Sequence, residues 1–121
     1  MAKIFIVEDD DSLRTLYQKI LTLKGHQVIA TATNGVEAVE VYKTLPVRPD
    51  VIVMDHRMPI KNGIEATKEI LEIDKNSTII FASADNSVKQ LALSIGAKRF
   101  ELKPFKINDL LRSIESALTL N

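Results

Sequence analysis

Apolar residues in this 121-residue chain fall into two kinds of pattern. The first is a set of five short runs of β-branched and other apolar residues, at positions 4–7, 28–31, 51–54, 78–82 and, more weakly, 99–102. Except in the weaker run 99–102, the apolar residues are continuous rather than alternating. The runs therefore predict strands that are covered on both faces, as in a parallel sheet.

The second pattern is a recurrence of apolar residues at spacings of three and four, which predicts helices with one buried face. The residues expected to face the core are Leu13, Leu16, Tyr17 and Ile20, then Ala38, Val39 and Tyr42, then Ala66, Ile70 and Ile73, then Val88, Leu91, Ala92 and Ile95, and finally Ile107, Leu110, Leu111, Ile114 and Leu118. Gly25 follows the first helix, where a left-handed cap is expected, and Gly96 ends the fourth. Five strands alternating with five helices predict βαβ units and hence a doubly wound α/β sandwich.

Length and composition are those of one ordinary soluble domain. Hydrophobic residues make up 45% of the chain and charged residues 26%, and no apolar run approaches the ~20 residues that cross a bilayer. The N-terminus has no pattern of a secretory signal. We therefore expect residues 1–121 to form a single domain with no membrane partner, in the cytoplasm.

Charge and cysteine content exclude further classes of protein. Sixteen Lys and Arg balance sixteen Asp and Glu, which argues against the strong positive field of a nucleic-acid-binding protein. Because the chain contains no cysteine, it has no disulfides, thiolate metal sites or cysteine nucleophiles.

Polar residues with chemical potential follow four of the predicted strands. Glu8 and Asp9 follow the first, Asp55 the third, Ser83 the fourth and Lys103 the fifth. The carboxyl ends of parallel strands converge at one edge of a sheet, where open α/β sheets bind their ligands. Several carboxylates, one hydroxyl and one ammonium at that edge suit a hard cation and phosphoryl chemistry.

Each of these residues also has a plainer structural interpretation. Acidic runs are usually solvated, and we interpret Asp11 and Ser12 as caps of the first helix. An Asp at the end of a strand is often a turn residue, and an isolated Lys is often on the surface. The first loop is acidic rather than glycine-rich, so it would repel a nucleotide phosphate and attract a divalent cation.

Four segments, IFIVEDD, DVIVMDHRMPIKNG, IIFASAD and GAKRFELKPF, together with their spacing, resemble the response-regulator receiver domain. This is the CheY-like family of two-component signalling, and the resemblance covers essentially the whole chain. It implies a flavodoxin-like fold with five parallel strands in the order 2-1-3-4-5. It also implies that Asp55 accepts a phosphoryl group from the phosphohistidine of a sensor histidine kinase or a histidine phosphotransfer protein.

The same resemblance assigns roles to the other residues at the strand ends. Mg²⁺, or Mn²⁺ in its place, would be held by Asp9, Asp55 and the backbone carbonyl of Arg57, and by Glu8 through a water molecule. Lys103 and Ser83 would hold the phosphoryl oxygens.

Phe100 matches the aromatic position that turns inward when the Ser83 hydroxyl moves toward the phosphoryl group. The surface of the fourth helix, fifth strand and fifth helix would then be read by a downstream protein. Without the family match, Phe100 is as readily a core residue.

The resemblance implies a signalling switch rather than a turnover enzyme. It also implies a receiver without an output domain, and a monomer that at most dimerises transiently.

Arg57 and Asp85 stand two residues after Asp55 and Ser83 respectively. Because their charges are opposite, we hypothesise that they pair across the site and hinder the water that would hydrolyse the acyl phosphate. Two solvated loop charges are the alternative interpretation. We interpret His56 as a loop residue and His26 as structural, since neither has the companions of a histidine metal site.

Three other functions compete with that of a receiver. A phosphohydrolase of the haloacid-dehalogenase type would use Asp9 and Asp11 as its acidic pair, with Asp9 as nucleophile. An interaction module could keep the fold and respond to binding rather than to phosphorylation. A flavin protein is disfavoured, because the acidic first loop would repel the phosphate of the cofactor.

Overall fold

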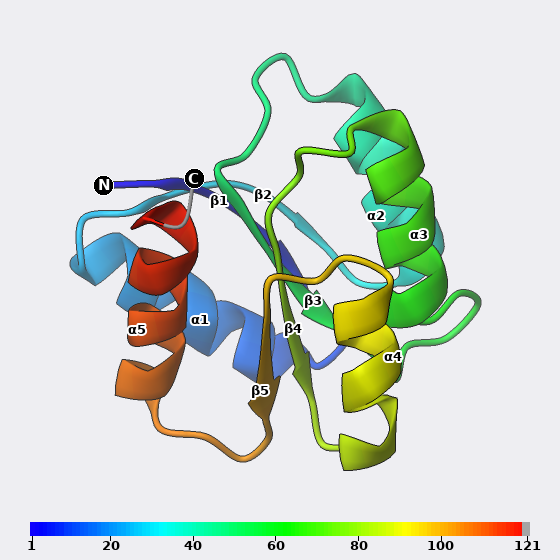
Figure 1. The fold of residues 1–121 in the computed structure, drawn as a ribbon. Helices are drawn as coiled ribbons and strands as arrows, with labels where there is room; N and C mark the ends of the chain where they lie inside the picture. The colour runs from blue at the N-terminus through cyan, green and yellow to red at the C-terminus, as the bar shows by residue number, and fades with distance from the viewer. Residues whose placement is uncertain (120–121) are drawn as a thin grey trace.

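Five parallel strands form the centre of the structure, a computed structural model that describes residues 1–119 (Figure 1). They are β1 (Lys3–Val7), β2 (Gln27–Ala32), β3 (Val51–Asp55), β4 (Ile79–Ser83) and β5 (Arg99–Leu102). Their order in the sheet is β2-β1-β3-β4-β5, which confirms the expected topology. Because the chain leaves β1 for β2 on one side and later places β3 on the other, the strand order reverses at β1. A crevice is expected at the carboxyl ends of β1 and β3.

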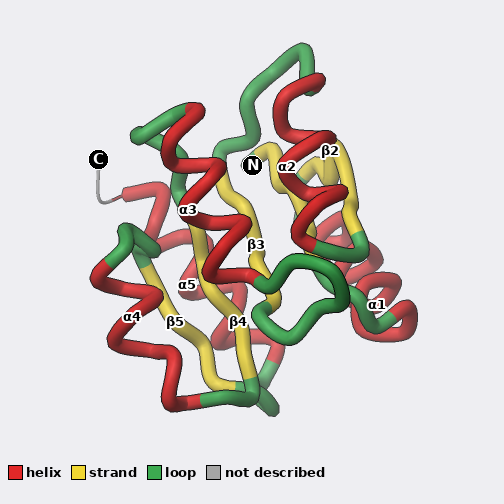
Figure 2. Tube along the Cα trace, turned by 90° about the vertical axis from the view of Figure 1, so that its right-hand side faces the viewer, coloured by secondary structure: helices red, strands yellow, loops and turns green. Residues whose placement is uncertain are grey.

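The helices cover both faces of this sheet (Figures 1 and 2). Their bounds are α1 (Asp11–Leu23), α2 (Gly35–Thr44), α3 (Gly63–Ile73), α4 (Lys89–Ser94) and α5 (Ile107–Thr119), and the 3₁₀ turn η1 (Asn86–Val88) precedes α4. Helices α1 and α5 lie on one face, and α2, α3 and α4 on the other. Among the described residues, no helix has the length and hydropathy needed to cross a membrane.

Strands β1 to β4 each contribute side chains to two separate apolar cores, whereas β5 contributes only Phe100, to one of them. On β1, Ile4 and Ile6 pack with residues of α1 and α5, whereas Phe5 and Val7 pack with residues of α2 and α3. All four side chains are fully buried. Burial on both faces explains why these strand sequences, unlike that of β5, are nearly continuously apolar.

The expected inner faces of three helices need correction. Leu16, Leu91 and Ile73 were expected to face the core, but they are 48%, 45% and 36% exposed. Leu21 on α1 and Ile64 on α3 are buried instead. A spacing of three or four residues includes positions at the margin of a helix face, and the neighbouring elements decide whether these are covered.

The cap of α1 also differs from the expectation. Asp10, rather than Asp11 or Ser12, is the N-cap residue, and its Oδ1 accepts a hydrogen bond from the backbone N–H of Leu13 at 2.9 Å. Asp11 is the first helical residue. The left-handed conformation expected at Gly25 is present, with φ of 90°.

Candidate functional site

Three carboxylates meet at the carboxyl ends of β1 and β3. These strands are neighbours in the sheet, with Val7 paired to Met54, so Glu8 and Asp9 leave β1 beside Asp55, the last residue of β3. One oxygen of each carboxylate lies within 4.8 Å of the others. Glu8 and Asp55 are only 2% and 6% exposed, whereas Asp9 is open to solvent. The cluster thus has a buried base and an accessible rim.

Lys103 brings one positive charge to this cluster from the loop after β5. Its Nζ lies 2.7 Å from Oε1 of Glu8 and 3.1 Å from Oδ1 of Asp55. The backbone N–H of Lys103 donates to the carbonyl oxygen of Ser83 at 2.8 Å, which holds this loop against the end of β4. The Lys103–Pro104 peptide bond is cis.

The single ammonium does not balance the negative charge of the buried carboxylates. Burial, followed by the charge of Glu8, raises the pKa of Asp55 from 3.8 to about 7, although Lys103 acts in the opposite direction. Burial alone would lower the pKa of Lys103, but its hydrogen bond to Glu8 and the charges of Asp55 and Glu8 outweigh burial and raise it. The site therefore has fewer positive than negative groups, and a bound cation would reduce this imbalance. Carboxylate oxygens in this number and separation fit Mg²⁺, a hard cation.

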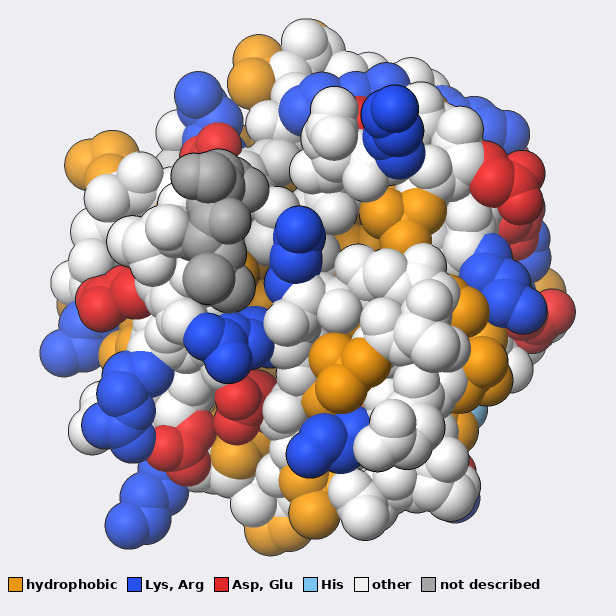
Figure 3. Space-filling view, viewed as in Figure 1, with side chains coloured by type: hydrophobic (Ala, Val, Ile, Leu, Met, Phe, Trp, Pro, Cys, Tyr) orange, Lys and Arg blue, Asp and Glu red, His pale blue; other side chains and the backbone are white. Residues whose placement is uncertain are grey.

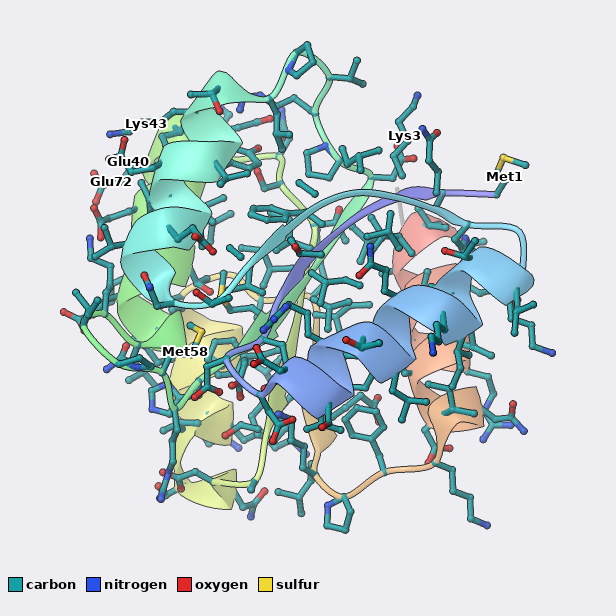
Figure 4. The ribbon with its side chains drawn as sticks, turned by 180° about the vertical axis from the view of Figure 1, so that it is seen from behind. Met1, Lys3, Glu40, Lys43, Met58 and Glu72 are labelled. Carbon is teal, nitrogen blue, oxygen red and sulfur yellow. The ribbon has the colours of Figure 1, made fainter. Side chains whose placement is uncertain are left out.

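The loop between β3 and α3 folds back onto Asp55. The backbone N–H of His56 donates to Oδ1 of Asp55 at 2.9 Å, and the N–H of Gly63 donates to the carbonyl oxygen of His56 at 2.9 Å. A Cβ atom on Gly63 would lie 2.1 Å from the backbone oxygen of Asp55, so no side chain fits there. Met58, labelled in Figure 4, belongs to the same loop and packs against the core on the side of α2 and α3.

Ser83, Arg57 and Asp85 lie at the same edge of the sheet, where β4 ends and where the loops after β3 and β4 begin. Ser83 ends β4, is buried, and accepts a hydrogen bond at Oγ from the backbone N–H of Asp85 at 3.0 Å. A guanidinium nitrogen of Arg57 lies 3.3 Å from Oδ2 of Asp85, although the Arg57 side chain is 76% exposed. The two oppositely charged residues singled out from the sequence are thus in contact, and they join the loops that follow β3 and β4.

Phe100 lies within β5 rather than at the carboxyl end of the strand. It is partly buried, and its ring stacks on that of Phe81 with centroids 6.1 Å apart. It does not take part in the carboxylate cluster. Of the two histidines, His26 accepts a hydrogen bond at Nδ1 from the N–H of Ala2, which agrees with a structural role. His56 is the loop residue expected, and burial lowers its pKa.

Two residues near the site were not singled out from the sequence. Arg14 donates to the carbonyl oxygen of Glu8 at 3.0 Å and pairs with Asp11 at 2.5 Å, so it ties the acidic loop to α1. The sequence did contain a signal for this contact, because Arg14 lies one turn into a helix that follows an acidic loop. Tyr17 was interpreted only as core, but burial raises its pKa to about 12, and the charges of Lys103 and Glu8 also act on it.

Residues 4–115 match the family model described as the response regulator receiver domain. The chain belongs to this family. Among related proteins, this receiver domain is 44% identical over 106 residues to the chemotaxis protein CheY of Thermotoga maritima, with 86% of this chain and 87% of that protein covered. It is 40% identical over 118 residues to CheY of Bacillus subtilis, with 96% and 97% covered.

Solved structures of receiver proteins have the same fold. The receiver domain superimposes with a TM-score of 0.91 on a chain of the CheX-CheY-BeF3-Mg+2 complex from Borrelia burgdorferi, at 32% identity, covering 97% of this chain and 89% of that one. It also superimposes on the response regulator domain of Thermotoga maritima CheB with a TM-score of 0.87, at 30% identity and 98% and 97% coverage. The family and the acidic cluster together identify a receiver domain of CheY type with a pocket suited to Mg²⁺.

The phosphohydrolase alternative finds no support in this arrangement. It required Asp9 and Asp11 as a pair, but Asp11 belongs to α1, pairs with Arg14 and lies outside the carboxylate cluster.

Proposed function

We propose that this receiver domain is a phosphorylation-activated switch of a two-component or phosphorelay system. Its phosphoryl donor is the phosphohistidine of a sensor histidine kinase or of a histidine phosphotransfer protein. The observation that carries the proposal is the environment of Asp55, which lies beside two other carboxylates and 3.1 Å from the ammonium of Lys103.

In the transfer step, an ionised oxygen of Asp55 attacks the phosphorus atom. A phosphorus–oxygen bond forms while the phosphorus–nitrogen bond to the donor imidazole breaks, and the imidazole nitrogen keeps the electron pair. Lys103 favours the ionised, nucleophilic form of Asp55 and, with the Ser83 hydroxyl, binds phosphoryl oxygens in the product.

The metal ligands of the proposal are Asp9, Asp55 and the backbone carbonyl of Arg57, with Glu8 acting through a water molecule. Mn²⁺ accepts the same oxygen ligands as Mg²⁺ and is the expected substitute. When bound, the cation supplies the positive charge that offsets repulsion between the Asp55 carboxylate and the incoming phosphoryl group.

The signal passes from Asp55 to Phe100 through Ser83. The Ser83 hydroxyl donates a hydrogen bond to a phosphoryl oxygen and moves toward it. Because Oγ of Ser83 also accepts from the N–H of Asp85, this movement rearranges the loop after β4, and Phe100 turns inward. This remodels the surface of α4, β5 and α5, which a downstream protein binds. Figure 3 shows apolar side chains toward α4 on this face and charged side chains toward α5. We further propose that the protein acts in the cytoplasm as a monomer that dimerises at most transiently.

Asp85 and Arg57 set the lifetime of the phosphorylated state in this proposal. Their ion pair joins the two loops that flank the phosphoryl position, and it restricts the approach of a hydrolytic water molecule.

Incubation of the protein with phosphoramidate and Mg²⁺, followed by intact mass spectrometry, tests the function. We expect the wild type to gain the mass of one phosphoryl group, Asp55→Asn to gain none, and the control Asp11→Asn to behave as the wild type. A label that persists in Asp55→Asn would refute Asp55 as the acceptor. The absence of any phosphorylated species in the wild type would instead support an interaction module that works without phosphorylation.

A further inference from the structure

Three aromatic rings form a continuous stack from the loop after Asp55 to the edge strand of the sheet. The ring centroids of His56 and Phe81 are 5.7 Å apart, with the rings inclined by 41°. Phe81 in turn stacks on Phe100, with centroids 6.1 Å apart and an angle of 15°. Phe81 and Phe100 are paired across β4 and β5, so the strand register holds the second contact in place.

His56 is an unusual residue for the first position of this stack. Its Nδ1 is enclosed, and no hydrogen-bond partner for it occurs among residues 1–119. A buried polar atom without a partner costs free energy that an apolar side chain of similar size would not cost. The histidine ring is therefore not explained by packing stability alone.

The backbone of His56 connects this ring directly to the phosphoacceptor. Its N–H donates to Oδ1 of Asp55 at 2.9 Å. Formation of an acyl phosphate at either carboxylate oxygen removes negative charge from the carboxylate, which weakens this hydrogen bond. The peptide unit that carries the His56 ring is then held less firmly when Asp55 is phosphorylated.

We propose that His56 and Phe81 are positioning residues that form a second mechanical link from Asp55 to Phe100, beside the link through Ser83. A shift of the His56 ring acts on Phe81, which is fully buried and cannot absorb the displacement in a close-packed core. Phe100 is only partly buried on the edge strand, so it has room to move.

The two links leave Asp55 through different loops and can be separated by mutation. Ser83 acts through the N–H of Asp85 in the loop after β4, whereas His56 lies in the loop after β3. The Arg57–Asp85 ion pair also joins these two loops, but neither residue belongs to the stack, and both links end at Phe100. Removing one link should therefore reduce the response of Phe100, and removing both should abolish it.

The test uses the full chain labelled with 4-fluorophenylalanine, with beryllofluoride and Mg²⁺ added to mimic phosphorylation. The ¹⁹F resonance of Phe100, assigned from the Phe100→Leu variant, is compared with and without beryllofluoride in each variant. We expect Ser83→Ala and Phe81→Leu each to keep about half of the wild-type change, and the double variant to lose it. His56→Ala should behave as Phe81→Leu.

Phe5→Leu is the matched control, because Phe5 is also fully buried, in the same core as Phe81, but is not part of the stack. It should leave the Phe100 response unchanged, which separates coupling from a general loss of packing. An equal response in Ser83→Ala and in its double variant with Phe81→Leu would overturn the second link.

This inference rests on the proposed function. The ¹⁹F signal of bound beryllofluoride distinguishes a failure of the proposed function from a failure of the inference. No bound signal in the wild type would refute phosphorylation at Asp55. A bound signal with a Phe100 response that is insensitive to His56→Ala and Phe81→Leu would refute the stack alone.

Discussion

Replacement of Asp55 by Asn should stabilise the folded chain in the absence of metal, although it removes the phosphoacceptor. Asp55 and Glu8 are both buried, and Lys103 is the ammonium that contacts both of them. An amide at position 55 removes the unbalanced charge and leaves Lys103 paired with Glu8. The charge of Asp55 thus lowers the free energy of unfolding of the metal-free protein.

The magnitude follows from the pKa of Asp55, which is raised from 3.8 to about 7 by folding. Below pH 3.8 both the folded and the unfolded states hold the proton. Between pH 3.8 and about 7 the unfolded chain loses it first, so the free energy of unfolding falls as the pH rises. Each pH unit in this window corresponds to about 1.4 kcal/mol, a ceiling of about 4 kcal/mol. Because water reaches the rim of the site, we expect a gain of about 2 kcal/mol for Asp55→Asn at pH 8.

Urea unfolding followed by far-ultraviolet circular dichroism measures this gain, since the chain has no tryptophan. With EDTA present, the advantage of Asp55→Asn should grow from pH 5 to pH 8. Glu40→Gln is the control, because Glu40 lies on the outer surface of α2 (Figure 4) and pairs only loosely with Lys43, at 4.0 Å. Saturating Mg²⁺ should stabilise the wild type and reduce or reverse the difference. An advantage that is absent at pH 8, or equal at both pH values, would show that charge at Asp55 is not the cause.

Three further predictions concern the loops around the site. Gly63→Ala should lower the free energy of unfolding by about 2 kcal/mol or more, because the alanine Cβ would lie 2.1 Å from the backbone oxygen of Asp55. An unchanged urea midpoint would contradict this prediction. Ile60→Gly should raise the free energy of unfolding by about 1 kcal/mol. Ile60 has a φ of 72°, a left-handed conformation that strains a β-branched residue, and its side chain is 82% exposed. A loss of stability in the same urea experiment would mean that the residue makes stabilising contacts. Arg57→Ala and Asp85→Ala should each speed the decay of the phosphorylated protein severalfold, measured by mass spectrometry after removal of the phosphodonor, and rates equal to the wild type in both variants would remove their proposed role.

The fold was predictable because burial on both faces of a sheet and on one face of a helix imposes regular spacings of apolar residues. All five strands lie within one or two residues of the predicted runs. The errors concern positions whose exposure depends on neighbouring elements. Leu16 and Leu91 have the spacing of a buried face, yet no strand or helix covers them fully.

The residues of the candidate site were predictable for a related reason. Glu8, Asp9 and Asp55 directly follow buried strands, and the geometry of a parallel sheet brings such positions together. Asp10 was not predicted as the cap, because any of several consecutive polar residues can cap the start of a helix. The contact of Arg14 with the carbonyl oxygen of Glu8 was missed because it depends on the path of the loop.

The sequence alone determined which chemical groups are present at the carboxyl edge of the sheet, since alternation of strands and helices already places them there. Only the tertiary structure decided how those groups interact. Burial of Glu8 and Asp55 around one ammonium raises the pKa of Asp55, and contacts between β3, β4 and β5 align His56, Phe81 and Phe100. Both effects depend on distances between residues far apart in the chain, which local spacing does not specify.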